Sequence, residues 1–393
     1  MKKSAELRRL LKALAVFCLF SAFSTQHSAL AVFEDTGTGA RATALGGAYT
    51  AMGDDTWSLL YNPAGLARSK QPEIVTEYSQ LLTGLSDGSN LYQYFTGVSV
   101  PLKSYGTAAV GWKEVGFSGL YNEQTVSLGY GQWILSNLAG GVAVKYLRQS
   151  FVVPNTVVDD SGNIQAGTPS LFSQNGNARA NLSADVGLLY RISDRQHLGF
   201  SVQNINEPNM ALDANDTDRL GRAWHVGWAG ENTRKLIITT DLSMDECSSC
   251  GMRDYSMIGG LEKWWGSASS SEFAARGALA VGNRDFQQVS TGFGYRLKNL
   301  NLDYAFVFTL SGEAIGNTSG THRFSLAYRF GSNKNALLLA KSHYPEVDEF
   351  PIAVLEGPEN PSNGVATNKS QFSKDVGTRS RSDEPQTNAR ARE

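Results

Sequence analysis

The chain has 393 residues, of which 40 are glycine, 10% are aromatic and 18% are charged. The formal net charge is -2, which gives no reason to expect a nucleic-acid partner. No apolar run of about 20 residues follows the N-terminal segment, so the sequence predicts no transmembrane helix in the mature chain. Abundant glycine and aromatic residues with few charges are typical of many short strands joined by tight turns.

The N-terminus has the parts of a secretory signal peptide. A basic start precedes an apolar stretch at Ala13–Phe23, and Ala29-Leu30-Ala31 supplies a small-x-small cleavage site. Cys18 follows the bulky Phe17 inside the apolar stretch, which disfavours a lipoprotein signal. We therefore predict that residues 1–31 are removed on export and take no part in the fold.

The stretch Gly37–Ala67 is rich in glycine and alanine, which allow close approach to a neighbouring wall at little cost in side-chain entropy. Asp54 or Asp55 is expected to cap a short helix over residues 56–61, because a carboxylate accepts the free amides of a first helical turn. Pro63 disfavours helical geometry at Asn62, so this helix should end there. We interpret residues 32–70 as a plug, or hatch, inside a barrel.

A rival interpretation of the same stretch is nucleotide binding. Residues Gly37–Ala42 fit the loose pattern G-x-G-x-x-A. That pattern indicates a dinucleotide site only after a strand and within a βαβ unit. Here it follows a signal peptide and no α/β alternation comes after it, so we predict no cofactor.

From residue 72 onward the dominant signal is alternation of apolar and polar residues with period two. About 14 segments of about 10 residues, the length that a tilted membrane strand needs, carry it. The expected strands are Glu73–Leu82, Leu91–Leu102, Tyr105–Phe117, Glu123–Ile134, Leu138–Val152, Arg179–Ile192, His197–Asn204, Arg222–Ala229, Arg234–Met244, Tyr255–Trp265, Glu272–Val281, Gln288–Leu297, Leu300–Thr309 and His322–Phe330.

The lengths of the connections favour a membrane barrel over a soluble β-sandwich, which also alternates. Short links, such as Lys103-Ser104, mostly alternate with long ones, such as Val153–Ala178. Outer-membrane barrels place short turns in the periplasm and long loops outside the cell. The sequence therefore predicts an all-β protein: a transmembrane antiparallel β-barrel over residues 71–331 with an N-terminal luminal plug, followed by a largely disordered periplasmic tail at 332–393.

The more polar face of the strands carries charges of both signs, and this face must point into the lumen because a charge facing lipid costs a few kcal/mol. Such charges either hold the plug or line a path for a polar or amphipathic solute. The residues expected to face the lumen are Lys145, Asp185, Asp241, Glu262, Arg276, Asp303, Arg323 and Arg329.

Two cysteines remain in the mature chain, Cys247 and Cys250. In an exported protein this C-x-x-C pair is expected to form a small disulfide within a loop. A zinc site would need further ligands nearby, and none occur.

The sequence contains no catalytic motif. His197, His225, His322 and His343 are widely separated, and none belongs to a G-x-S-x-G or H-E-x-x-H motif. We therefore predict no catalytic residues, no metal site and no enzyme activity.

Two runs in the predicted plug, G-x-R-A-x-A-L-G-G-A-x-x-A-x-x-D-D and Y-N-P-A-G-L-A, resemble the N-terminal region of PorV/PorQ-like outer-membrane proteins, a family related to FadL-type (OMPP1/FadL/TodX) channels for hydrophobic compounds. The resemblance implies a plugged barrel in the bacterial outer membrane, in contact with its lipid. It also implies either a fatty-acid-like hydrophobic ligand or, alternatively, a scaffold that assists exported proteins or the secretion machinery. The plug or ligand residues it suggests are Arg41, Asp54, Asp55, Asn62, Pro63 and Ala64.

Overall fold

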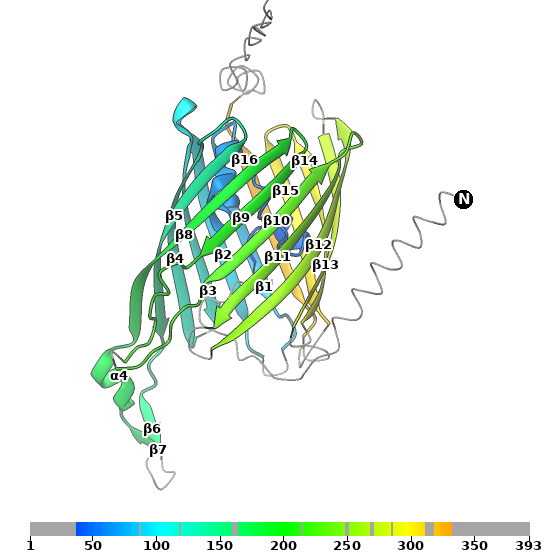
Figure 1. The fold of residues 1–393 in the computed structure, drawn as a ribbon. Helices are drawn as coiled ribbons and strands as arrows, with labels where there is room; N and C mark the ends of the chain where they lie inside the picture. The colour runs from blue at the N-terminus through cyan, green and yellow to red at the C-terminus, as the bar shows by residue number, and fades with distance from the viewer. Residues whose placement is uncertain are drawn as a thin grey trace, which may run out of the picture. The chain divides into compact units, whose positions relative to one another are not determined.

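The computed structural model describes residues 37–331, with gaps at 86–87, 118, 159–163, 214, 248–250, 268–270, 284–285 and 311–317. The predicted signal peptide (1–31) and tail (332–393) lie outside the described residues. Within them the chain forms a closed antiparallel barrel of fourteen strands, as the sequence predicts (Figure 1). No described helix is long and apolar enough to cross a bilayer.

Each barrel strand begins and ends within three residues of its predicted position, because the period-two pattern is unbroken between turn residues. The barrel closes where the first strand pairs with the last, from Glu73 opposite Arg329 to Gln80 opposite His322. The strands are β1 (Glu73–Leu81), β2 (Leu91–Pro101), β3 (Thr107–Phe117), β4 (Tyr121–Trp133), β5 (Leu138–Phe151), β8 (Ala178–Ser193), β9 (Gln196–Gln203), β10 (Ala223–Glu231), β11 (Leu236–Cys247), β12 (Met252–Ser267), β13 (Ser271–Gly282), β14 (Gln287–Leu297), β15 (Leu300–Thr309) and β16 (Thr321–Arg329).

The two faces of the wall differ in polarity. On β5 the outward Val142, Val144 and Tyr146 are about half exposed, whereas the inward Ala143 and Leu147 are buried. On β1 the inward face carries buried glutamates and a serine. An apolar exterior around a polar interior is the arrangement of a barrel surrounded by lipid.

The N-terminal residues Gly37–Arg68, hereafter the luminal segment, lie inside this barrel (Figure 1, blue). Helix α2 (Ala40–Ala44) packs against β13–β16, and the 3-10 helix η1 (Pro63–Arg68) packs against β3, β4, β5 and β8 on the nearly opposite side of the ring. The short helix α3 (Ser58–Tyr61) lies between them in the chain. The segment therefore spans the lumen from wall to wall.

The prediction for α3 was right about its end and wrong about its start. The helix ends at Tyr61, and Asn62 has extended geometry (φ -154°, ψ 102°), as expected before a proline. Its N-cap is Trp57, and no side chain caps it. Asp54 and Asp55 do not cap it because their carboxylates bind Arg41 instead.

One long connection carries structure that the sequence did not predict. Within the expected loop Val153–Ala178 lie β6 (Thr156–Val158), β7 (Ile164–Ala166) and α4 (Ser170–Asn175). These elements project from the end of the barrel that carries the long loops (Figure 1). The opposite end has short turns, including the 3-10 turn η2 (Lys103–Tyr105).

Glycines on the inner face of the wall make room for η1. A Cβ added at Gly141 on β5 would lie 2.2 Å from the backbone nitrogen of Ala64. A Cβ at Gly131 on β4 would lie 2.5 Å from the carbonyl oxygen of Pro63. Side chains at these positions would overlap backbone atoms, so bare backbone is required where the luminal segment meets the wall.

We expect Gly141→Ala to destabilise the barrel by about 1–3 kcal/mol, because the new methyl group must displace η1. Urea unfolding in lipid vesicles, followed by tryptophan fluorescence, measures this loss. Gly259→Ala is the matched control, since a Cβ there meets no atom within 4 Å. Equal stabilities of the two variants would contradict the close seating of η1.

Candidate functional site

The centre of the lumen is organised around Arg41, which is 7% exposed. Its Nε and Nη2 donate to the two carboxylate oxygens of Glu262 on β12, at 2.9 and 2.8 Å. Its Nη1 donates to Asp54 at 2.9 Å and to Asp55 at 3.3 Å. A planar guanidinium suits such a two-pronged bond to a carboxylate, and here it ties the luminal segment to the wall.

The wall continues this ion network. Arg276 on β13 donates from Nε to Glu262 at 2.6 Å and from Nη1 to Asp303 on β15 at 2.7 Å. Two guanidinium groups therefore share the carboxylate of Glu262, which is fully buried. Of the predicted lumen-facing residues, Glu262, Arg276 and Asp303 are thus brought together.

A second group of charges lies on β1 and β16, and the sequence analysis missed its acidic half. Glu77 accepts from the backbone nitrogen of Gly39 and from Arg323 Nη1, the latter at 3.0 Å. Glu73 accepts from the backbone nitrogen of Thr56 at 2.8 Å and from Arg329 Nε at 2.8 Å. The alternation of β1 could have identified Glu73 and Glu77 as lumen-facing, because both occupy its inward positions.

The pKa values of the adjacent carboxyl groups of Asp54 and Asp55 are shifted in opposite directions. Burial raises the pKa of Asp54, but the charges of Arg41 and Arg68 outweigh burial and lower that pKa to about 2. Burial, and then the neighbouring charge of Asp54, raise the pKa of Asp55 to about 7. Asp55 also accepts a hydrogen bond from the hydroxyl of Tyr49. These contacts tie Asp54 and Asp55 to Arg41 within the luminal segment.

The Asn62-Pro63-Ala64 bend is held by neutral hydrogen bonds. Asn62 Nδ2 donates to the carbonyl oxygens of Thr50, at 2.8 Å, and of Leu188 on β8, at 3.0 Å. Its Oδ1 accepts from the backbone nitrogen of Ala64 at 3.1 Å, which caps η1. The side-chain amide of Asn62 therefore joins Thr50 and Ala64 of the luminal segment to β8 of the wall.

The remaining predicted lumen residues divide into two groups. Asp241 on β11 accepts from the backbone nitrogen of Thr50 at 3.0 Å and so contacts the luminal segment. Lys145 and Asp185 pair with each other at 2.8 Å and bind Asn204, which follows β9. They therefore fasten the β9–β10 connection rather than the luminal segment.

The predicted disulfide lies outside what the structure describes, since Cys250 and the side chain of Cys247 are not among the described parts. Among the described residues, no group of three His, Cys, Asp or Glu side chains is placed to hold a metal ion.

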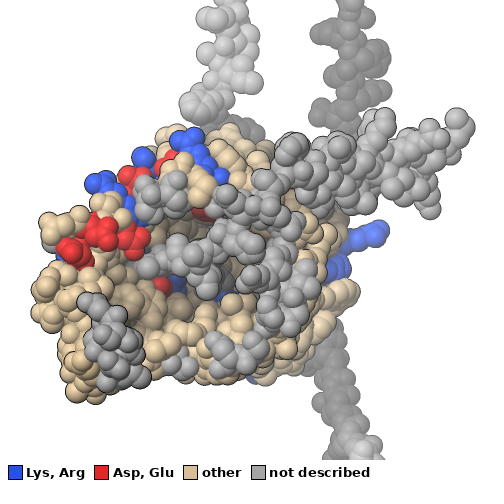
Figure 2. Space-filling model, turned by 90° about the horizontal axis from the view of Figure 1, so that it is seen from below, with Lys and Arg blue, Asp and Glu red and all other residues tan. Residues whose placement is uncertain are grey.

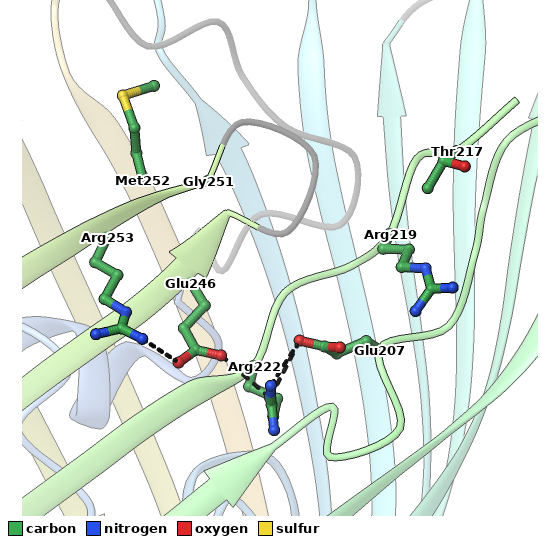
Figure 3. Close-up of a pocket in the computed structure, with 8 residues that line it drawn as sticks. All are labelled: Glu207, Thr217, Arg219, Arg222, Glu246, Gly251, Met252 and Arg253. Carbon is green, nitrogen blue, oxygen red and sulfur yellow. Dashed lines mark hydrogen bonds and ion pairs between the residues drawn. The ribbon is translucent and has the colours of Figure 1, made fainter.

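Two cavities lie at opposite ends of the barrel, and both are polar. One, of about 540 Å³, lies between the β9–β10 connection and the ends of β11 and β12 (Figure 3). In it Arg222 pairs with Glu207 and Glu246, both at 3.1 Å. The other, of about 90 Å³, is lined by Arg296, Arg329 and neighbours at the short-turn end.

Comparison with solved structures identifies the fold. The toluene transporter TodX of Pseudomonas putida aligns with a TM-score of 0.54 at 11% identity, over 76% of this chain and 99% of that chain. The toluene transporter TbuX of Ralstonia pickettii aligns with a TM-score of 0.53 at 12% identity, over 76% of this chain and 100% of that chain. The monoaromatic hydrocarbon channel CymD gives 0.52 at 10%, over 77% and 100%. This is the fold that the FadL-type resemblance implied.

The family comparison covers a smaller part of the chain. The model of the F plasmid transfer operon TraF protein matches residues 114–242, which is less than half of the chain. No curated protein matches the chain. The expected PorV/PorQ resemblance therefore stays a prediction.

We expect Arg41→Gln to lower the free energy of unfolding by about 3 kcal/mol, because it removes one of the two guanidinium groups that bind the buried Glu262 and the one that binds the buried Asp55. Urea unfolding of the protein in lipid vesicles checks this. Arg222→Gln serves as the control, since its side chain is 40% exposed and the loss should stay below about 1 kcal/mol. A similar loss for both variants would show that Arg41 does not anchor the segment.

The raised pKa of Asp55 predicts a pH dependence of stability. Between about pH 4 and pH 7 the folded protein keeps a proton that an unfolded aspartate, with a pKa of about 3.9, has released. The free energy of unfolding should therefore fall as pH rises through this range, by at most about 1.4 kcal/mol per unit, and level off above pH 7. Asp54, with its lowered pKa, contributes in the opposite sense and only as pH falls below about 4.

Asp55→Asn should remove this part of the pH dependence, because the amide does not titrate. The measurement is the unfolding free energy of wild type and variant at pH 5, 6, 7 and 8. Parallel curves for the two proteins would refute the assignment of the slope to Asp55.

Proposed function

We propose that this protein is an outer-membrane channel that admits hydrophobic small molecules, with the luminal segment as its gate. The observation that carries the proposal is the fold shared with TodX, TbuX and CymD, which are described as toluene transporters and a monoaromatic hydrocarbon channel. The apolar exterior supports a place in lipid. Residues 1–31 would direct export, and the short turns would face the periplasm.

The gate has two differently fastened halves. Residues 37–56 are held by the buried ion pair between Arg41 and Glu262, whose disruption costs about 3–5 kcal/mol. The backbone nitrogens of Gly39 and Thr56 also donate to the buried carboxylates of the wall strand β1. The Asn62 bend and η1 are held by packing, by neutral hydrogen bonds worth about 0.5–1.5 kcal/mol each, and by one hydrogen bond from Arg68 to the carbonyl oxygen of Met52; they form no buried ion pair with the wall among the described residues. The neutral half is the cheaper one to move, so the path opens along β4, β5 and β8, where η1 packs.

A second candidate function is the scaffold for exported proteins that the PorV-like resemblance implies. One observation favours it: the luminal segment crosses the barrel, and neither of the two cavities described above is lined mainly by apolar residues. A closed barrel of this kind would act through its ends rather than through its lumen.

Flux measurements in proteoliposomes separate the two functions. We expect the wild type to admit toluene and to exclude glucose, because only an apolar compound is compatible with a narrow opening at η1. Deleting residues 37–68 should admit both solutes, since the lumen beneath is polar. A wild type that passes neither solute, beside a deletion variant that passes both, would contradict the channel and favour the scaffold.

A further inference from the structure

The two ends of the barrel differ in charge. At the short-turn end, the exposed basic residues of the turns and strand ends are Lys70, Lys103, Arg195, Arg234, Lys235 and Lys298. Within the described residues of the same turns and strand ends, the exposed acidic residues are Asp194 and Glu231. This end, hereafter the basic mouth, thus carries a clear excess of positive charge.

The long-loop end has the opposite tendency. Two of its basic side chains are compensated locally, since Arg222 binds Glu207 and Glu246, and Arg253 lies 3.7 Å from Glu246. Figure 2 shows this end hollowed, with acidic and basic side chains gathered together on one side of the opening. Further acidic residues lie in its connections and strand ends: Asp213, Asp216, Asp218, Asp245 and Asp254.

Positive charge at the basic mouth extends onto the inner side of the wall. The guanidinium of Arg191 lies 5.3 Å from the ring centre of Trp133, whose Nε1 donates to the carbonyl oxygen of Ala67 in the luminal segment. On the far side, the guanidinium of Arg296 lies 4.2 Å from the ring centre of the buried Trp264. These cations face the opening and are screened from surrounding lipid by the wall.

A recess at this mouth has the size and charge to accept a carboxylate. The cavity of about 90 Å³ is lined by Arg296, Lys298 and Arg329, by Glu272 and by side-chain amides that include Asn299. Glu272 is already bound by Lys235 and Arg296. Basic groups therefore outnumber acidic ones around a space that amides also line, which favours a bound anion.

We propose that the basic mouth is a docking surface for an acidic peptide segment of a soluble partner, with one acidic side chain seated in the recess. Lipid headgroups beside the barrel would reach outward cations such as Lys263, but not the inner Arg191 and Arg296. A molecule that covers the opening from the aqueous side reaches the turns and the inner cations together.

The test uses the full chain in phosphatidylcholine nanodiscs and a fluorescent poly-glutamate peptide, with binding followed by fluorescence anisotropy. We expect saturable binding that weakens as salt is raised above about 0.15 M, where the Debye length is about 8 Å. The double variant Arg195→Gln/Lys298→Gln should bind roughly fivefold more weakly. The matched variant Arg219→Gln/Arg253→Gln, exposed at the other end, should bind within about twofold of wild type.

Three results would overturn the proposal. The first is equal affinity of the two double variants for the peptide, at unchanged melting temperatures, which would show that the peptide does not bind at the basic mouth. The second is full displacement of the peptide by free glutamate at the same carboxylate concentration, which would indicate a small-anion site. The third is binding of phosphatidylglycerol vesicles that is lost in Arg195→Gln/Lys298→Gln and kept in Arg219→Gln/Arg253→Gln, which would assign the surface to lipid headgroups.

Discussion

The two-pronged bond between Arg41 and Glu262 is the interaction on which the rest of the lumen depends. Both side chains are buried, so each needs the other, and Arg276, Asp54 and Asp55 complete the shell around them. A buried ion network adds little to the free energy of unfolding compared with an apolar core, but removal of one partner is strongly destabilising because it leaves a buried charge unpaired. It therefore specifies one position of the luminal segment rather than simply making the barrel more stable.

The barrel could be predicted almost completely from the sequence, and the luminal contacts could not. Strand positions follow from the local alternation of apolar and polar residues, which can be recognised without any knowledge of the tertiary contacts. Contacts such as Arg41 with Glu262 join residues 221 positions apart, and nothing local in the sequence pairs them. Asp54 and Asp55 show a similar limit over a shorter span, because the guanidinium of Arg41, 13 and 14 positions away, binds the carboxylates that a local rule would use to cap the helix.

Some luminal residues were nevertheless within reach of sequence reasoning. Glu73 and Glu77 occupy the inward positions of β1, where a charge facing lipid is excluded, so alternation alone places them in the lumen. Gly131 and Gly141 also lie on inward positions, yet their role became clear only with η1 in place. The short elements β6, β7 and α4 were not predicted because each is only three to six residues long, which is too short for a periodic pattern of apolar residues.

The ionic half and the neutral half of the luminal segment are joined by Arg68. Arg68 ends the neutral half, and its Nη1 donates to the carbonyl oxygen of Met52 at 2.9 Å, so it also borders the ionic half. Its charge helps to keep the pKa of Asp54 low. Arg68 therefore links the two halves of the luminal segment, because it lies in η1 and binds the backbone of Met52.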